Sequence, residues 1–156
     1  MSEPEYSEEV TATRRIARPV GAADPDVVLV LPAIRDSVGI ARQMVLAVGD
    51  RAGIDDERNA DVAIAVSEAC ANVVAHAYGA DDEDPGELWL EAWLEPERMV
   101  LLVRDDGPGF APRYSDERGG LGLGLPLMIA IADEVTFRRS EDGANEVMLS
   151  FAVEPA

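Results

Sequence analysis

Two spacings of apolar residues along the chain predict its secondary structure. Apolar residues three and four positions apart predict helices over 36–51 and 55–78, with Asp36 or Ser37 capping the first and Asp55 or Asp56 the second. Runs rich in β-branched, aromatic and other apolar residues predict strands near 26–32, 87–94, 99–105, 134–139 and 146–153, and a further helix is expected over 121–132. This order predicts an α+β sandwich with helices on one face of a sheet.

The strands at 87–94 and 99–105 flank "EPER", a turn with proline at a favoured position, and so form a hairpin. If Leu94 pairs with Met99, the period of two places Asp105 at the end of the core-facing side. The other face then carries Trp89, Trp93, Val100 and Leu102. We interpret this face as an exposed patch for a homodimer or another partner, or alternatively as cross-strand packing that includes a cation–π pair between Arg104 and Trp89.

Composition changes this picture little. The chain has 156 residues, of which 47% are hydrophobic and 28% charged, as in an ordinary globular protein with one domain. Residues 1–26 are polar and acidic and contain three prolines, so we expect a disordered extension followed by a domain over 27–156. The acidic start lacks the basic-then-apolar order of a secretory signal, and Cys70 is the single cysteine. Both features favour a cytoplasmic protein.

The formal net charge of -18 constrains the partners. Nucleic acid and anionic membranes attract basic surfaces, so we expect this chain to bind neither. A macromolecular partner that is itself basic fits the charge better, although acidity also serves solubility alone.

Three stretches carry candidate chemistry. In "VSEACANVVAHAY" (66–78), Glu68, Asn72 and His76 recur every four residues beside the apolar face of the predicted helix. A carboxylate and an amide aimed together at a ligand would explain this spacing, and a solvated helix edge would explain it as well.

The second stretch, "RDDGPGF" (104–110), follows a predicted strand. Asp105 lies at the strand's end on the core side, where a carboxylate needs a hydrogen-bond donor such as a ligand amino group. Gly107 and Gly109 would let a ligand approach the backbone, but the same residues also suit a plain turn.

The third stretch, "RGGLGLGLPLM" (118–128), is a glycine-rich run that leads into an apolar helix. Free N–H groups at a helix N-terminus attract anions, so this run is a candidate phosphate site, with Arg113 or Arg118 as local positive charge. A merely flexible loop is the alternative.

In this order the three stretches resemble the nucleotide-binding boxes of the GHKL ATPase superfamily, which has the Bergerat fold. "EACANVVAHAY" resembles its N box, "DDGPGF" its first glycine box and "GLGLGL" its second. The form "SEACANVVAHAY" and the single small domain are most similar to the anti-sigma-factor serine/threonine kinases. The resemblance covers about residues 27–153 and implies a mostly antiparallel, mixed sheet.

The resemblance also implies roles for individual residues. Glu68 would be the general base, Asn72 a ligand of Mg²⁺, and Asp105 the acceptor for the adenine amino group of ATP or ADP. His76 would lie close to the site as a hydrogen-bonding residue of the helix edge. The implied nucleotide-binding set is completed by Gly107, Gly109, Arg118, Gly120, Leu121, Gly122, Leu123 and Gly124. Asn145 stands where the family often has threonine, so a polar contact from that position is in doubt.

The function implied by the resemblance is an anti-sigma factor that holds a sigma factor inactive. It would also phosphorylate a serine or threonine of a STAS-domain anti-anti-sigma protein. The alternatives are a nucleotide-dependent binding module without phosphotransfer and an ATPase domain coupled to a second domain.

Overall fold

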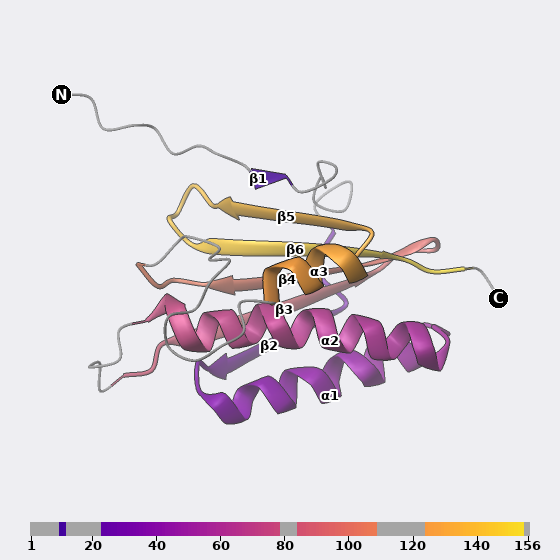
Figure 1. The fold of residues 1–156 in the computed structure, drawn as a ribbon, viewed down its shortest axis with the longest axis horizontal. Helices are drawn as coiled ribbons and strands as arrows, with labels where there is room; N and C mark the ends of the chain where they lie inside the picture. The colour runs from indigo at the N-terminus through magenta and orange to yellow at the C-terminus, as the bar shows by residue number, and fades with distance from the viewer. Residues whose placement is uncertain (1–9, 12–22, 79–83, 109–123, 155–156) are drawn as a thin grey trace.

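The computed structural model describes residues 10–11, 23–78, 84–108 and 124–154. Figure 1 shows a sheet with the helices gathered on one of its faces. In chain order the elements are β1 (Val10–Thr11), β2 (Val27–Pro32), α1 (Arg35–Arg51), α2 (Asp56–Asn72), the π-helical turn η1 (Val73–Ala77), β3 (Glu87–Leu94), β4 (Arg98–Asp105), α3 (Gly124–Ile131), β5 (Glu134–Arg139) and β6 (Asn145–Ala152).

The six strands form one sheet in the order β1-β5-β6-β4-β3-β2. Every pairing among the described strands is antiparallel, so the expectation of a mixed sheet is wrong for this part of the chain. The predicted α+β class with helices on one face is confirmed. Because β4 lies in the middle of the sheet, between β3 and β6, its last residue is held from both sides.

The predicted hairpin register is confirmed, since Leu94 pairs with Met99 and Leu88 with Asp105. The helix-facing residues of β3 and β4 are nearly all buried and join one core with the apolar faces of α1 and α2. That core includes Leu88, Leu90, Ala92, Met99, Leu101, Val103, Val62, Val66, Ala69 and Val73.

The first two helices begin differently from one another. The Asp55 side chain accepts a hydrogen bond from the Arg58 N–H at 2.9 Å, which confirms the predicted cap of α2. No side chain caps α1, so the predicted cap at Asp36 or Ser37 is wrong. The Ser37 hydroxyl instead donates to the Pro32 carbonyl at 2.6 Å and fastens α1 to the end of β2.

The long helix predicted to reach Tyr78 changes type near its end. Its α-helical part stops at Asn72, η1 continues it to Ala77, and Tyr78 is extended. By length and composition alone, the combined helix Asp56–Ala77 could cross a membrane, but half of its most apolar window is buried inside the fold. In the structure this helix packs against the sheet as a core helix.

The face of the sheet away from the helices is not the exposed patch that we expected. Trp93 is only 5% exposed, and Val100, Leu102 and Met148 are fully buried, so these four residues form a second small core. The Trp93 indole donates to the Ala23 carbonyl at 2.9 Å, which places the segment before β2 on this face. The alternative of cross-strand packing therefore applies, and the Arg104 guanidinium lies 6.0 Å from the Trp89 ring centre.

Two short pieces of residues 1–26 make defined contacts. Val10 and Thr11 pair with Phe137 and Thr136 as β1. The Asp26 carboxylate accepts from the Leu94 N–H at 2.7 Å beside the start of β2. The other residues of that segment, apart from 23–25, lie outside the described residues.

Candidate functional site

Glu68 and Asn72 lie in the last turns of α2, four residues apart and therefore side by side. Both side chains are half-buried, although Ala65 and Ala69 beside them are buried in the core. The predicted pairing of a carboxylate with an amide on this helix is thus present in the fold.

The N-terminus of α3 lies directly over this pair. A Cβ atom on Gly124 would come 2.8 Å from Glu68 Oε2 and 3.7 Å from Asn72 Oδ1. Two side-chain oxygens therefore lie close to the first residue of α3, and a larger residue there would force the Glu68 carboxylate to move. Pro126 falls in the first turn of α3, where its missing N–H costs no helical hydrogen bond.

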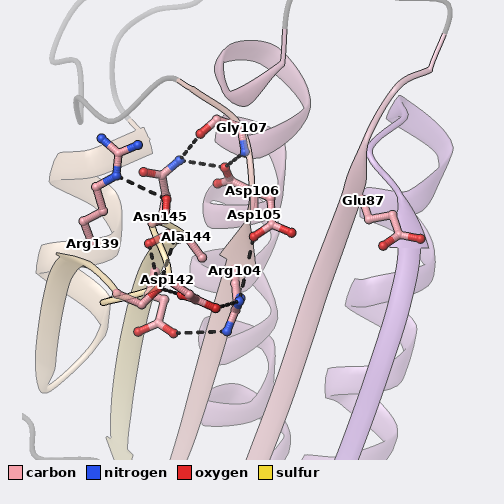
Figure 2. A network of polar contacts seen from close by, with 12 residues as sticks. Glu87, Arg104, Asp105, Asp106, Gly107, Arg139, Asp142, Ala144 and Asn145 are labelled. Carbon is pink, nitrogen blue, oxygen red and sulfur yellow. Dashed lines mark hydrogen bonds and ion pairs between the residues drawn. The ribbon is translucent and has the colours of Figure 1, made fainter.

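Asp105 is the last residue of β4. As predicted, it lies on the buried side, and the residue is only 6% exposed. Its Oδ1 accepts two hydrogen bonds, from the Gly107 N–H at 2.9 Å and from Asn145 Nδ2 at 2.8 Å (Figure 2). Burial raises the pKa of Asp105 above its ordinary value, and these two donors oppose the rise. Among the described residues, Oδ2 of Asp105 accepts no hydrogen bond, so one oxygen remains for a ligand donor.

Asn145 is a part of the site that the sequence left in doubt. Besides Asp105, its amide donates to the Gly107 carbonyl at 2.9 Å, so one side chain holds both the acceptor residue and the glycine after it (Figure 2). Asn145 opens β6, and its register partners are Asp105 on β4 and Arg139 on β5. The departure from the usual threonine therefore keeps a polar contact at this position.

Gly107 lies where the Asp105 end of the site contacts the helix that carries Glu68 and Asn72. A Cβ on Gly107 would lie 1.9 Å from the Ala77 carbonyl oxygen, so the backbone after β4 rests directly on the end of η1. This contact brings the loop after Asp105 close to the helix that carries Glu68 and Asn72. Two motifs that are separated in the sequence by the whole of β3 thus meet at one end of the sheet.

A charged row lies beside Asp105 on the outer face of the sheet. Arg104 contacts Asp142 at 2.5 Å (Figure 2). It also lies 3.9 Å from Glu146, and Glu146 pairs with Arg138 at 2.5 Å. Glu146 is buried, so its pairing with two arginines offsets its desolvation. These contacts tie β4, β5 and β6 together next to the site.

Oxygen ligands for a cation are present, but not as a closed cage. In the described part of the chain, no group of three or more histidine, cysteine, aspartate or glutamate side chains could hold a metal. The Asn72 amide oxygen fits Mg²⁺, which takes few protein ligands and completes its shell with water and phosphate oxygens.

Of the remaining predicted site residues, the structure describes only His76. His76 lies in η1, half-buried and beyond the α-helical register that relates Glu68 to Asn72. A π-helical turn of this kind often occurs at functional sites. Gly109, Arg113, Arg118, Gly120, Leu121, Gly122 and Leu123 lie outside the described residues, and their roles stay predictions.

Comparison with known proteins gives this fold and site a class. Residues 31–151 match the family described as the histidine kinase-like ATPase domain. The chain belongs to this family, as the three boxes indicated.

Similar curated proteins are more specific in name. A protein from Bacillus pumilus named serine-protein kinase RsbW is 34% identical over 134 residues, which cover 78% of this chain and 82% of that protein. The protein of the same name from Bacillus subtilis is 35% identical over 118 residues, covering 67% of this chain and 72% of the relative. A crystal structure of the RsbU and RsbW domains of a Mycobacterium tuberculosis protein shares the fold, with a TM-score of 0.63 and 22% identity over 83% of this chain and 32% of that one.

Proposed function

We propose that the chain is a cytoplasmic, ATP-dependent protein serine/threonine kinase that is also an anti-sigma factor. It phosphorylates a serine or threonine of a STAS-domain anti-anti-sigma protein and sequesters a sigma factor. The observation that carries the proposal is the convergence of Glu68 and Asn72 on Gly124, the first residue of α3. The similarity to proteins named serine-protein kinase RsbW supports the kinase class.

Adenine binds at the Asp105 end of the site in this proposal. Oδ2 of Asp105 accepts from the adenine amino group, while Asn145 and the Gly107 N–H hold Oδ1. The bare backbone at Gly107 admits the flat ring beside the end of η1. The phosphates then extend toward Gly124 and the N-terminus of α3, where free N–H groups stabilise negative charge.

Phosphoryl transfer takes place at the Glu68 end. The acceptor hydroxyl oxygen attacks the γ-phosphorus, the bond from that phosphorus to the ADP oxygen breaks, and Glu68 takes the hydroxyl proton. Asn72 would hold Mg²⁺ through its amide oxygen, and the bound ion would neutralise phosphate charge. The chain contains no lysine, so positive charge at the phosphates comes from arginine, backbone N–H groups and the metal.

Charge gives a physical reason for partner switching. Phosphorylation adds about -1.5 to -2 charges to the antagonist. The kinase carries -18, so the phosphorylated antagonist is repelled more strongly than the unmodified one. Release of the antagonist leaves the kinase available to the sigma factor.

A transfer assay tests the proposal. The purified chain, Mg²⁺ and γ-labelled ATP are incubated with a STAS-domain protein and, as a control, with a variant of that protein whose acceptor serine is alanine. Label should enter only the unmodified substrate and only with Mg²⁺ present. If the chain binds ATP and its partners but transfers no label to any STAS-domain protein, it is a nucleotide-dependent binding module.

A further inference from the structure

Tyr78, the first residue after η1, makes a complete set of hydrogen bonds with its hydroxyl group. The hydroxyl donates to the Glu87 carbonyl at 2.5 Å and accepts from the N–H groups of Glu87 at 3.2 Å and Asp106 at 3.1 Å. One donor and two acceptor positions are all that a phenolic hydroxyl has, so its capacity is filled. The chain segments that meet here are the end of the helix, the start of β3 and the loop after β4.

The aromatic ring is held as firmly as the hydroxyl. Gly86 has φ +75°, and a Cβ there would lie 2.3 Å from Cε1 of Tyr78. The Gly86 N–H also donates to the Asp84 carboxylate at 2.9 Å, which shapes the turn on which the ring lies. Glycine at this position thus allows both the left-handed backbone conformation and the close contact with the Tyr78 ring.

Two successive residues at the end of the helix therefore contact two successive residues of the loop after β4. The Ala77 carbonyl contacts Gly107, and the Tyr78 hydroxyl accepts from Asp106. Asp106 and Gly107 have left the sheet, because β4 ends at Asp105. In the described structure their backbone is held by Tyr78 and Ala77 on one side and by Asn145 on the other.

We propose that Tyr78 is a positioning residue for recognition of the nucleotide base. Through Asp106 it fixes the loop directly after Asp105, and with it the Gly107 N–H that holds the Asp105 carboxylate, at a set place relative to the helix bearing Glu68 and Asn72. This inference rests on the proposed function, since it assigns the base to Asp105. Tyr78 itself touches neither the phosphates nor the reacting atoms.

The Tyr78→Phe substitution in the full chain tests the proposal, because it keeps the ring on Gly86 and removes only the hydroxyl. ATP, ITP and tripolyphosphate, each with Mg²⁺, are the probes in binding titrations. ITP carries a carbonyl oxygen where ATP carries the amino group, so the ratio of the two affinities reports on Asp105. We expect ATP affinity to fall about 3- to 10-fold, the effect of losing the one of the three hydroxyl hydrogen bonds that reaches Asp106, with the ATP-to-ITP ratio falling alongside it. Tripolyphosphate affinity should stay the same.

A matched control separates positioning from general stability. Ile54→Val removes one buried methylene group at the turn between α1 and α2, far along α2 from Tyr78, and costs a similar amount of stability. It should leave the ATP-to-ITP ratio unchanged. In the transfer assay, Tyr78→Phe should raise KM for ATP more than it lowers kcat, whereas the control should change neither.

Several outcomes would overturn the proposal. An unchanged ATP-to-ITP ratio in Tyr78→Phe would do so, as would equal losses for ATP and tripolyphosphate. If Tyr78→Phe does not fold, Gly86→Ala provides the second variant, because it displaces the ring while keeping the hydroxyl; the same fall in the ratio supports the proposal, and an unchanged ratio rejects it. Failure of the wild-type chain to bind ATP would instead reject the proposed function.

Discussion

Asn145 Nδ2 lies 2.8 Å from Asp105 Oδ1 and donates to it, across the paired ends of β6 and β4. The same oxygen also accepts from the Gly107 N–H. The orientation of the carboxylate is therefore set by the protein before any ligand arrives. Preorganisation of this kind lowers the cost of binding, because the acceptor needs no rearrangement.

Asp105→Asn should make apo stability less dependent on pH. Burial raises the pKa of Asp105 in the folded chain, so the folded state favours the protonated carboxyl group. This preference stabilises the fold fully below the unfolded pKa of about 3.9, and the stabilisation is lost as pH rises through the folded pKa. The amide keeps an oxygen for both donors and carries no charge. The stability of Asp105→Asn relative to wild type should thus increase from about pH 4 to pH 7. Urea unfolding of both proteins at four pH values measures this difference in the free energy of unfolding. A difference that does not change with pH would contradict the argument.

ATP or ADP with Mg²⁺ should stabilise the wild-type chain. At a nucleotide concentration of about 100 times Kd, binding contributes about 2.7 kcal/mol, or about 5–10 °C in Tm for a domain of this size. Asp105→Asn should show a smaller shift, because its amide can present N–H groups to the adenine amino group. Thermal denaturation with and without millimolar nucleotide is sufficient. A wild-type Tm that does not move would reject nucleotide binding.

Glu68→Gln should separate chemistry from binding. The substitution keeps size and helix position, so nucleotide and sigma-factor binding should stay near normal, while loss of a general base reduces transfer about 100-fold or more. Asn72→Ala should behave differently and weaken Mg²⁺-dependent nucleotide binding as well. The two variants are compared by calorimetry and by label transfer. Wild-type transfer by Glu68→Gln would show that Glu68 is not the base.

Gly124→Ala should stabilise a helix and impair the enzyme in one step. Alanine is favoured over glycine in helices by about 0.5–1 kcal/mol, but its Cβ would lie 2.8 Å from Glu68 Oε2 and force that carboxylate to move. Gly39→Ala in α1 is the matched control, since beyond its own helix turn the added Cβ would meet no described atom within 4 Å. The control should gain stability with full activity, and equal transfer rates for the two variants would exclude crowding at Glu68.

Arg58→Met should cost about 1–2 kcal/mol of stability. The Arg58 guanidinium donates to the Ile131 carbonyl at 3.0 Å and to Asp133 at 2.6 Å, and it lies 5.5 Å from the Phe151 ring centre. It thereby joins α2, the end of α3 and β6. Arg98→Met is the control, because its pair with Glu95 stays within one turn and is worth less than about 0.5 kcal/mol. Equal losses in chemical denaturation would count against a joining role for Arg58.

Local patterns predicted the hairpin because alternation and turn chemistry act over a few residues. Leu94 faces Met99 as expected, and Asp105 falls on the buried side. The pairing of Glu68 with Asn72 followed from helical spacing alone. Their closeness to Gly124 followed only from the family resemblance, since nothing local fixes where α3 begins.

The errors have both long-range and local causes. Trp93 looked exposed because the sequence does not show that the segment at Ala23 crosses the outer face of the sheet. The π-helical turn was missed because Val73 and Ala77 continue the apolar spacing of an α-helix. Tyr78 carried no local signal either: its partners lie 9 and 28 residues away.

The pairing of β1 with β5 bears on how the protein should be shortened. Residues 31–151, the part that matches the family, contain neither Val10–Thr11 nor Ala23. Even a cut just before Asp26, which keeps β2, would leave the N–H and C=O groups of β5 open along Thr136 and Phe137 and remove the acceptor of the Trp93 indole. Open strand edges recruit other chains, so the shortened form should self-associate more than the full chain at equal concentration. The part of the chain that matches the family is thus smaller than the part needed to cover the edge of β5.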